Sequence, residues 1–501
     1  MNHGLILPIL LPMFIGCLLL FGARLSMPVK RSLSLSSTAV LVLLSFWLMW
    51  QADQGVLQVY ALGNWQPPFG IILLLDRLSA LLLVVTAVLG SFALLYAVRG
   101  DDERGQSFHA LFQFQLMGIN GAFLTGDLFN LFVFFEILLI ASYALLVHGG
   151  GVERVRAGLH YVVLNLVGSA FFLLAVGVLY GITGTLNMAD MAIRVAAAGP
   201  DDAALLGAAG LLLLVVFGLK AAFLPLYFWL PKAYASATAP VAALFAIMTK
   251  VGLYSIIRVY TLIFGDEAGS LANMANDWLW PIALLTLALG VIGALAAVSL
   301  QGLLAYLVVV SVGTLLAGIA IGTEQALAAA LYYLVHSTWV AGGLFLLADL
   351  IARQRGDKQA LLVQGPALQN PHLLGGLFFF GAIAVAGLPP LSGFIGKLLL
   401  LRSLEPGLQA LLLWPIVLGG GLLTLIALSR AGSRLFWRVG LSQLDSAELD
   451  YGRLLACAGL LLLSLLLMVG AAPLLSYVEA TASQLHDLAL YRQIIESGAA
   501  R

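Results

Sequence analysis

Long apolar stretches, each about as long as a lipid bilayer is thick, are the feature that most constrains this chain. A helix needs about 20 mostly apolar residues to cross a membrane. Fourteen such stretches follow one another along the 501 residues, near 4–22, 34–51, 70–98, 108–125, 128–148, 159–182, 205–231, 240–263, 278–299, 303–322, 325–351, 373–403, 408–430 and 454–477. The sequence therefore predicts an all-α polytopic membrane protein with about 14 transmembrane helices.

The composition favours a protein that lies in lipid and excludes several other classes. Hydrophobic residues make up 62% of the chain and charged residues only 10%, whereas soluble domains carry roughly 25% charged residues. The net charge of zero gives no sign of a nucleic-acid surface. Cys17 and Cys457 lie in apolar runs, so neither a disulfide framework nor a cysteine metal site is predicted. The start, "MNHGLILPILLPM", lacks a basic segment and a cleavage site, which favours a first membrane helix over a signal peptide.

Basic residues between the predicted helices set the orientation, because cytoplasmic loops carry more lysine and arginine. One side collects Arg24, Lys30, Arg31, Arg99, Arg104, Arg154, Arg156, Lys232, Arg353, Arg355, Lys358, Arg430, Arg434, Arg438 and Arg453. The other side has only Arg194, Arg258, Arg402, Arg492 and Arg501. Arg77 follows Asp76 at a helix start, where an adjacent ion pair or snorkelling accounts for it. The first side is therefore predicted to be cytoplasmic, and with an even number of helices both termini lie on the outer side.

Four charged residues remain near the centres of predicted helices: Glu136 in "FNLFVFFEILLIASY", Lys220, Lys250 and Lys397. Each costs roughly 2.5–3.5 kcal/mol at that depth, so such a set persists when its members face water and one another. A structural salt bridge between Glu136 and Lys220 is the alternative, but one carboxylate cannot neutralise three lysines. Burial favours a neutral lysine and a nearby carboxylate favours a charged one. The pattern therefore indicates a proton relay.

Prolines interrupt two of the helices that carry these lysines. Lys220 precedes Pro225 by five residues in "FGLKAAFLPLYFWLP", and Lys397 follows Pro389 and Pro390 in "AGLPPLSGFIGKLLLL". Proline removes a backbone donor and clashes with the preceding turn, so both helices are predicted to break within the membrane. Broken helices in corresponding positions are typical of transporter sites, although a single one is also explained by a packing kink.

Other polar residues are weaker candidates for the relay. His336, in "LYYLVHSTWVAGGLF", lies mid-helix and can exchange a proton near neutral pH, although a lone helical histidine is often only hydrogen bonded. Asp127, His148, His160, Thr249 and Asp349 are secondary candidates nearer helix ends, where capping or interfacial solvation also explains them. The sequence has no clustered carboxylates or histidines, so no metal site and no cofactor are predicted.

Four motifs resemble one known family over nearly the whole chain. They are "TGDLFNLFVFFEILLIASYALL", "GSAFFLLAVGVLYGITGTLNMADM", "GLKAAFLPLYFWLPKAYASATAPVAALFAIMTKVGLYSIIRVY" and "VAGLPPLSGFIGKLLLL". The chain is similar to the proton-translocating antiporter-like subunits shared by Mrp-type (Pha, Mnh) cation/proton antiporters and respiratory complex I. Within that family it most resembles the D-type Mrp subunits. The chain is too short for the A or L types, and Lys397 replaces the glutamate usual in the M type, whereas the N type also has a lysine there.

The resemblance implies two inverted five-helix repeats, at 108–265 and 278–432, each with a proline-broken helix. Three helices at 1–107 would precede them, and a last helix with a polar tail at 433–501 would follow. It also implies that Glu136 pairs with Lys220, that Lys250 bridges the repeats, and that His336 and Lys397 continue the relay. Some relatives carry a lysine shortly after that histidine, where this chain reads "HSTWVAGG".

The function implied is proton transport within a hetero-oligomeric Na⁺/H⁺ or K⁺/H⁺ antiporter of a bacterial cytoplasmic membrane. The expected partners are the A, B/C, E, F and G subunits, the cations, protons and lipids, with no nucleic acid. The first alternative is a proton-pumping N- or M-type subunit of a complex I-like NADH:quinone oxidoreductase. The second is a structural or receptor-like membrane protein, in which the buried charges would be dispensable.

Overall fold

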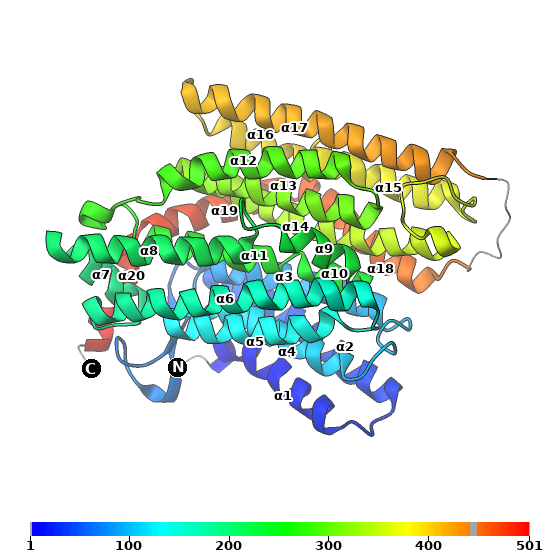
Figure 1. The fold of residues 1–501 in the computed structure, drawn as a ribbon. Coiled ribbons are helices and arrows are strands. Elements are labelled where there is room, and N and C mark those ends of the chain that lie inside the picture. Colours follow the sequence, from blue (N-terminus) through cyan, green and yellow to red (C-terminus); the bar gives the residue numbers. More distant parts are fainter. Residues whose placement is uncertain (1–2, 441–447, 500–501) are drawn as a thin grey trace.

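The computed structural model describes residues 3–440 and 448–499, and these residues are almost wholly helical. Long helices lie side by side along one direction, and the first and last described helices lie toward the same end of the bundle (Figure 1). Among the candidate spans, the segments Ala239–Leu262, Leu300–Ile321 and Glu324–Arg353 are the most completely buried and form the centre.

The chain begins with η1 (His3–Ile6), α1 (Leu7–Phe21), α2 (Met27–Ala52) and α3 (Arg77–Ala97). There follow α4 (Phe108–Leu124), α5 (Leu128–Leu146), α6 (Val152–Thr183), α7 (Met188–Ala196), α8 (Pro200–Ala221), α9 (Trp229–Ser236), α10 (Ala239–Phe245) and α11 (Met248–Leu262). The next group is α12 (Asn276–Ala296), α13 (Leu300–Ile321), α14 (Glu324–Arg353), α15 (Pro371–Ala386), α16 (Ser392–Arg402) and α17 (Leu408–Gly432). The described chain ends with α18 (Tyr451–Val469), α19 (Ala471–His486) and α20 (Leu488–Ala499). Short turns are η2 (Leu62–Asn64), η3 (Gly269–Leu271), η4 (Gly356–Lys358) and η5 (Ser433–Trp437).

Twelve helical segments of the described chain are long and apolar enough to cross a membrane, compared with the fourteen predicted. The two other predicted spans are α4, with only 17 residues, and the segment 373–403, which is divided into the shorter helices α15 and α16. The exact count of fourteen thus depends on how these two are assigned.

A small β-hairpin interrupts the predicted all-α fold between α2 and α3. Strand β1 (Gln58–Ala61) pairs antiparallel with β2 (Ile72–Leu75), with Gln58 opposite Leu75. The prediction of a helix over 70–98 was therefore wrong for its first residues. The buried side chain of Asp76 accepts a hydrogen bond from the Ser79 N–H at 2.9 Å and starts α3 at Arg77, so the apolar run before it continues as a strand.

The two helices that the sequence predicts to be broken at Pro225 and at Pro389 and Pro390 are both broken. Residues 222–228, which include Pro225, separate α8 from α9, and residues 387–391, which include Pro389 and Pro390, separate α15 from α16. A third, shorter interruption at 246–247 separates α10 from α11 just before Lys250. All three lysines of the predicted relay therefore lie next to, or within two turns of, a helix end.

Two backbone bridges with the same pattern occur in the two halves of the chain. The N–H groups of Leu128 and Met188 donate to Leu186 and Gly126 at 2.9 and 3.0 Å, around an antiparallel bridge between residues 127 and 187. In the second half, the N–H groups of residues 300 and 362 donate to residues 360 and 298, each at 2.9 Å, around a bridge between residues 299 and 361. In the first half, the turn before α5 is thus joined to the segment after α6. In the second half, the turn before α13 is joined to the segment after α14.

Candidate functional site

Glu136 and Lys220 lie near each other but do not form the direct ion pair that the resemblance implies. Glu136, on α5, is half-buried and accepts a short hydrogen bond from the Ser169 hydroxyl of α6. In the last turn of α8, the Lys220 ammonium donates to the Asn165 side-chain oxygen at 3.0 Å. Among residues 3–440 and 448–499, neither charged group has an oppositely charged side chain within ion-pair distance, although the Glu136 charge does act on Lys220.

Helix α6 provides the connection between these two groups. Asn165 and Ser169 are one turn apart and therefore lie on the same face of α6. Between them is Gly168, where an added Cβ would lie 2.6 Å from the end of the Leu219 side chain, so α6 and α8 are in close contact here. Asn165 and Ser169 are absent from the residues predicted from the sequence. Two small polar residues four apart in an apolar helix were the signal that could have identified them.

Lys250 occupies the most buried position of the predicted relay, with no exposed surface. Its ammonium is 3.4 Å from the hydroxyl of Ser311 on α13, so it bridges the two halves of the chain through one weak hydrogen bond. The neighbouring Thr249 is also fully buried, and its hydroxyl has no hydrogen-bond partner within the described part of the chain. Within residues 3–440 and 448–499, Lys250, like Lys220, has no carboxylate at ion-pair distance.

His336 and Lys397 meet at the end of α15, the first half of the second broken helix. The last four carbonyls of a helix have no partner within the helix. The Lys397 ammonium donates to two of them, Val385 at 3.1 Å and Ala386 at 3.0 Å. The Nδ1 of His336 lies 2.8 Å from the hydroxyl of Ser392, the first residue of α16.

The first broken helix ends differently. The N–H of Phe223 donates to the Gly218 carbonyl at 3.1 Å, and the indole N–H of Trp229 donates to the Leu219 carbonyl at 3.0 Å. The donors at this end are neutral and keep their protons, whereas the donor at the end of α15 is an ammonium that can lose one.

The relay residues therefore fall into three hydrogen-bonded groups. The first holds Glu136 and Lys220, the second Lys250, and the third His336 and Lys397. No direct hydrogen bond joins one group to another within the part of the chain described here. In the structure these three groups are therefore separate.

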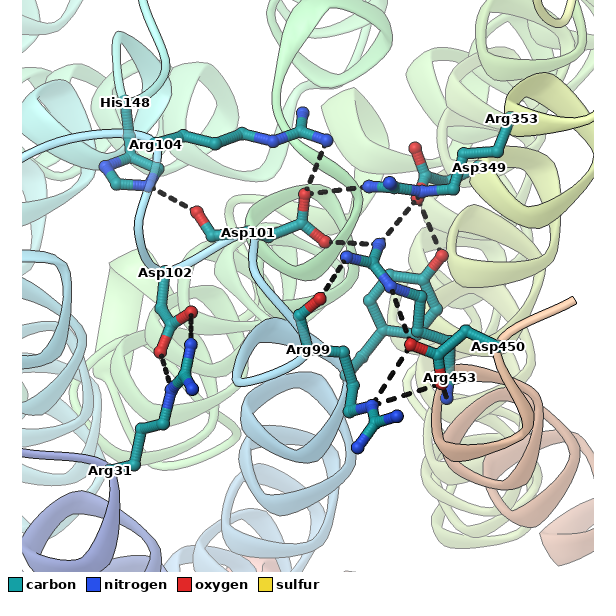
Figure 2. A network of polar contacts seen from close by, with 11 residues as sticks. Arg31, Arg99, Asp101, Asp102, Arg104, His148, Asp349, Arg353, Asp450 and Arg453 are labelled. Atoms are coloured by element: carbon teal, nitrogen blue, oxygen red, sulfur yellow. Dashed lines mark hydrogen bonds and ion pairs between the residues drawn. The ribbon is translucent and has the colours of Figure 1, made fainter. Parts of the chain in front are cut away.

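A separate ionic network, which we call the Asp101 cluster, consists of Arg99, Asp101, Arg104, Asp349, Arg353, Asp450 and Arg453. Of the secondary candidates, Asp349 belongs to this cluster and His148 contacts it. Figure 2 shows the Asp101 carboxylate facing three guanidinium groups, those of Arg104, Arg353 and Arg453, at 3.0, 2.9 and 2.6 Å. Asp349 pairs with Arg353 at 2.5 Å, and His148 lies 2.8 Å from the Asp101 carbonyl. These two side chains therefore hold helix ends together and make no contact with the relay.

The remaining secondary candidates are dispersed. His160 is exposed on α6. Asp127 caps α5 by accepting from the Asn130 N–H at 2.7 Å. Burial raises the pKa of Asp127 to about 6, against the opposing effect of this hydrogen bond. No group of three or more histidine, cysteine or acidic residues that could hold a metal ion occurs in the described residues.

Arg258 does not lie where the sequence predicts it to be. Its predicted place is a loop, and Asp76 is predicted to pair with the adjacent Arg77. Arg258 lies in α11, only 1% exposed, and makes a two-pronged ion pair with Asp76 at 2.6 and 3.0 Å. Tyr491 of α20 donates to the same carboxylate at 2.8 Å, and Arg77 pairs instead with Asp53. The predicted helix 240–263 already contained this arginine, but its acidic partner lies 182 residues away in the chain. Arg501, counted with it, lies outside the described residues.

A cavity of about 650 Å³ opens at the end of the bundle that carries the Asp101 cluster. Its lining comes from the α5–α6 loop, the α9–α10 junction and α14, and includes Arg154, Thr238 and Asp349. The buried hydroxyl of Thr238 has no partner among the described residues. The lining of this cavity therefore comes from both halves of the chain.

Comparison with known proteins identifies a family and solved structures that this chain resembles. Residues 125–424 match the family described as NADH:quinone oxidoreductase/Mrp antiporter, transmembrane. The D-type subunit of a probable K⁺/H⁺ antiporter of Rhizobium meliloti is 42% identical over 97% of this chain and 96% of the relative. The D-type subunit of a Na⁺/H⁺ antiporter of Bacillus subtilis is 38% identical, with 97% of both chains covered. In the solved structure of the Mrp complex from Dietzia sp., one chain is 25% identical, with a TM-score of 0.86 over 99% of this chain and 100% of that chain.

Proposed function

Because the chain belongs to the NADH:quinone oxidoreductase/Mrp antiporter family and, within it, to the D-type antiporter subunits, we propose that its buried charges conduct protons. The relay comprises Glu136, Lys220, Lys250, His336 and Lys397, with water between the three hydrogen-bonded groups. The protein exchanges internal Na⁺ or K⁺ for external protons, and each charge that crosses gains about 2.3 kcal/mol per 100 mV of membrane potential.

The observation that carries this proposal is the contrast between the buried lysines and the buried arginine of α11. Arg258, which cannot lose its proton, faces the carboxylate of Asp76. Lys220, Lys250 and Lys397 bind only amide, hydroxyl and carbonyl oxygens. A lysine with such neutral partners can release a proton without leaving an unpaired carboxylate behind, as removing one partner of a buried ion pair would.

In this mechanism the side chains hold and release protons at named atoms. The Glu136 carboxylate attracts a proton to the Lys220 ammonium, and loss of that attraction releases it. The Lys250 ammonium, in its apolar surroundings, passes a proton between the halves. His336 and Lys397 receive it where the carbonyls of α15 stabilise positive charge, as the negative end of a helix dipole does.

Vesicle exchange tests the relay. Glu136→Ala and Lys220→Ala, each in the complete antiporter at equal expression, are expected to reduce cation-driven pH change about 100-fold, the order supplied by a placed acid or base. Arg194→Ala is the matched control, because its ion pair with Asp190 on α7 is half exposed. Exchange that stays unchanged in both relay variants would reject the proposal. Running the assay with Na⁺ and then K⁺ identifies the cation.

A second candidate is a proton-pumping component of a quinone-reducing complex, because the matching family includes such subunits. The subunits that purify with the chain from its own membrane separate the two candidates. Small antiporter-type membrane subunits support the first function, and subunits that oxidise NADH or reduce quinone support the second.

The placement in the membrane and the internal repeats belong to the same proposal. The chain lies in a bacterial cytoplasmic membrane, with the Asp101 cluster and its basic loops on the cytoplasmic side and both termini outside. The repeats are 108–265 and 278–432, preceded by 1–107 and followed by 433–501. The matching backbone bridges at 127/187 and 299/361 support this division.

A further inference from the structure

His336 is the first member of a hydrogen-bond chain that crosses three helices. Its Nδ1 lies 2.8 Å from the hydroxyl of Ser392, the first residue of α16. The Ser392 hydroxyl lies in turn 2.7 Å from that of Ser464, in the middle of α18. His336 is 1% exposed and both serines are fully buried, so each group depends on the others for its hydrogen bonds.

The direction of this chain when His336 is neutral follows from which ring nitrogen carries the hydrogen. With the hydrogen on Nε2, the other nitrogen, Nδ1, accepts from the Ser392 hydroxyl. Because Ser392 uses its hydrogen in this bond, its oxygen is free to accept from Ser464.

The same two hydroxyls also accommodate the protonated ring. A proton added to Nδ1 makes that nitrogen a donor, and the Ser392 hydroxyl turns to accept from it and to donate to Ser464. The Ser464 hydroxyl can then turn to the carbonyl one helical turn earlier, as buried helical serines do. In this step one N–H bond forms at Nδ1, and one O–H bond breaks in the water that delivers the proton in the proposed relay; the two serine hydroxyls only rotate.

Resting on the relay described above, we propose that Ser392 and Ser464 are positioning residues that reverse their hydroxyls with the protonation state of His336. Helix α18 thereby becomes part of the site. Ser392 starts the same helix whose Lys397 binds the end of α15. The hydroxyl pair therefore lets His336 gain and lose a proton while its hydrogen bond to the first turn of α16 is kept.

The test compares Ser392→Ala and Ser464→Ala with Ser337→Ala in the complete antiporter. Ser337 is the matched control, because it is a buried serine beside His336 that donates only to the Leu334 carbonyl of its own helix, at 3.2 Å. We expect Ser392→Ala to slow exchange about tenfold, as losing one buried hydrogen bond does, and Ser464→Ala to slow it less. In Ser392→Ala, half-maximal exchange should move to lower pH, because the protonated ring is left with an unpaired N–H. In Ser464→Ala the shift should be in the same direction but smaller, because Ser392 still accepts from the ring and only its own hydroxyl loses a partner.

Two further variants, Ser392→Cys and His336→Ala, separate the outcomes. Ser392→Cys retains the size and a weaker donor, so it should recover part of the rate and of the pH profile. If Ser392→Ala prevents assembly, Ser464→Ala carries the test, because it leaves the direct partner of His336 in place. His336→Ala with unchanged exchange would contradict the relay itself. A loss of exchange in His336→Ala, with both serine variants matching Ser337→Ala, would overturn this inference and leave the relay standing.

Discussion

At the scale of single residues, the environment of a buried charge decides whether it is permanent or can be exchanged. The Arg258 guanidinium is shared between the Asp76 carboxylate and the hydroxyls of Tyr254 and Tyr491. A charge held in this way resists change, because removing either partner leaves the other buried alone. Asp127 lies between these two cases, the permanent charge and the exchangeable one. Its carboxylate is buried and hydrogen bonded, but no cation faces it among the described residues.

Asp127 gives a pH dependence of stability with a defined sign. Its folded-state pKa of about 6 lies above the ordinary value of 3.8, so between pH 4 and 6 the folded protein binds more protons than the unfolded chain. Stability contributed by this group therefore falls as the pH rises through that window. Asp127→Asn keeps an N-cap acceptor and should stabilise the protein by about 1–3 kcal/mol above pH 6.

Thermal unfolding of the detergent-solubilised protein between pH 4 and 8 measures this effect. The difference between Asp127→Asn and the unchanged protein should be close to zero at pH 4, grow up to pH 6 and then remain constant. A difference independent of pH would show that the carboxylate keeps its ordinary pKa.

At the scale of elements, the broken helices turn backbone groups into ligands. Breaking α15 frees carbonyls that the helix would otherwise use, and Lys397 occupies two of them. Gly387 makes this geometry accessible, since its φ is +81° and an added Cβ would lie 2.7 Å from the Lys397 side chain. The shape of the break and the position of the lysine therefore depend on one residue.

Gly387→Ala is expected to displace the Lys397 ammonium from its carbonyls and to slow exchange. The left-handed backbone adds a cost of about 1–3 kcal/mol in stability for a residue with a side chain. Gly376→Ala is the control within the same helix, because a Cβ there meets nothing within 4 Å. Exchange and thermal unfolding measured together separate the two effects. Equal exchange in both variants would mean that the α15 carbonyls do not hold Lys397 in its working position.

How much of these elements the sequence predicts depends on whether the signal is local. Apolar length and proline position are local, so the spans and both helix breaks follow from the residues themselves. The β2 strand does not, because an apolar run of six residues before Asp76 suits either structure until its hairpin partner is known.

The residues of the candidate site also divide into those that local sequence predicts and those that it does not. Buried charges at helix centres predict Glu136 and the three lysines as candidates. The contacts of Asn165, Ser169, Ser392 and Ser464, in contrast, depend on packing between distant segments. The residue that faces each charge is therefore a tertiary property.

At the scale of the molecule, the Asp101 cluster joins parts that are far apart in the chain. Asp101 follows α3, Arg353 ends α14, and Arg453 lies in the first turn of α18. Their ion pairs meet at one carboxylate that is only 1% exposed (Figure 2). The N-terminal helices, the second half of the bundle and the last membrane helix are thus fastened at one point.

Asp101→Asn should destabilise the protein by about 3–5 kcal/mol, the cost of breaking a buried ion pair from one side. It leaves three guanidinium groups facing one another without their shared anion. Asp357→Asn, at an exposed position in η4, provides the control with the same change of charge. Thermal unfolding at neutral pH distinguishes them, and equal melting temperatures for the two variants would mean that the cluster contributes no stability.

The unlike closures of the two broken helices give the molecule a polarity that its repeated architecture lacks. The end of α8 is sealed by an indole, which stays in place whatever the pH. The end of α15 is bound by an amine. In the proposed relay, loss of the Lys397 proton therefore also weakens the contact between α15 and α16, so proton transfer changes the second helix break and leaves the first unchanged.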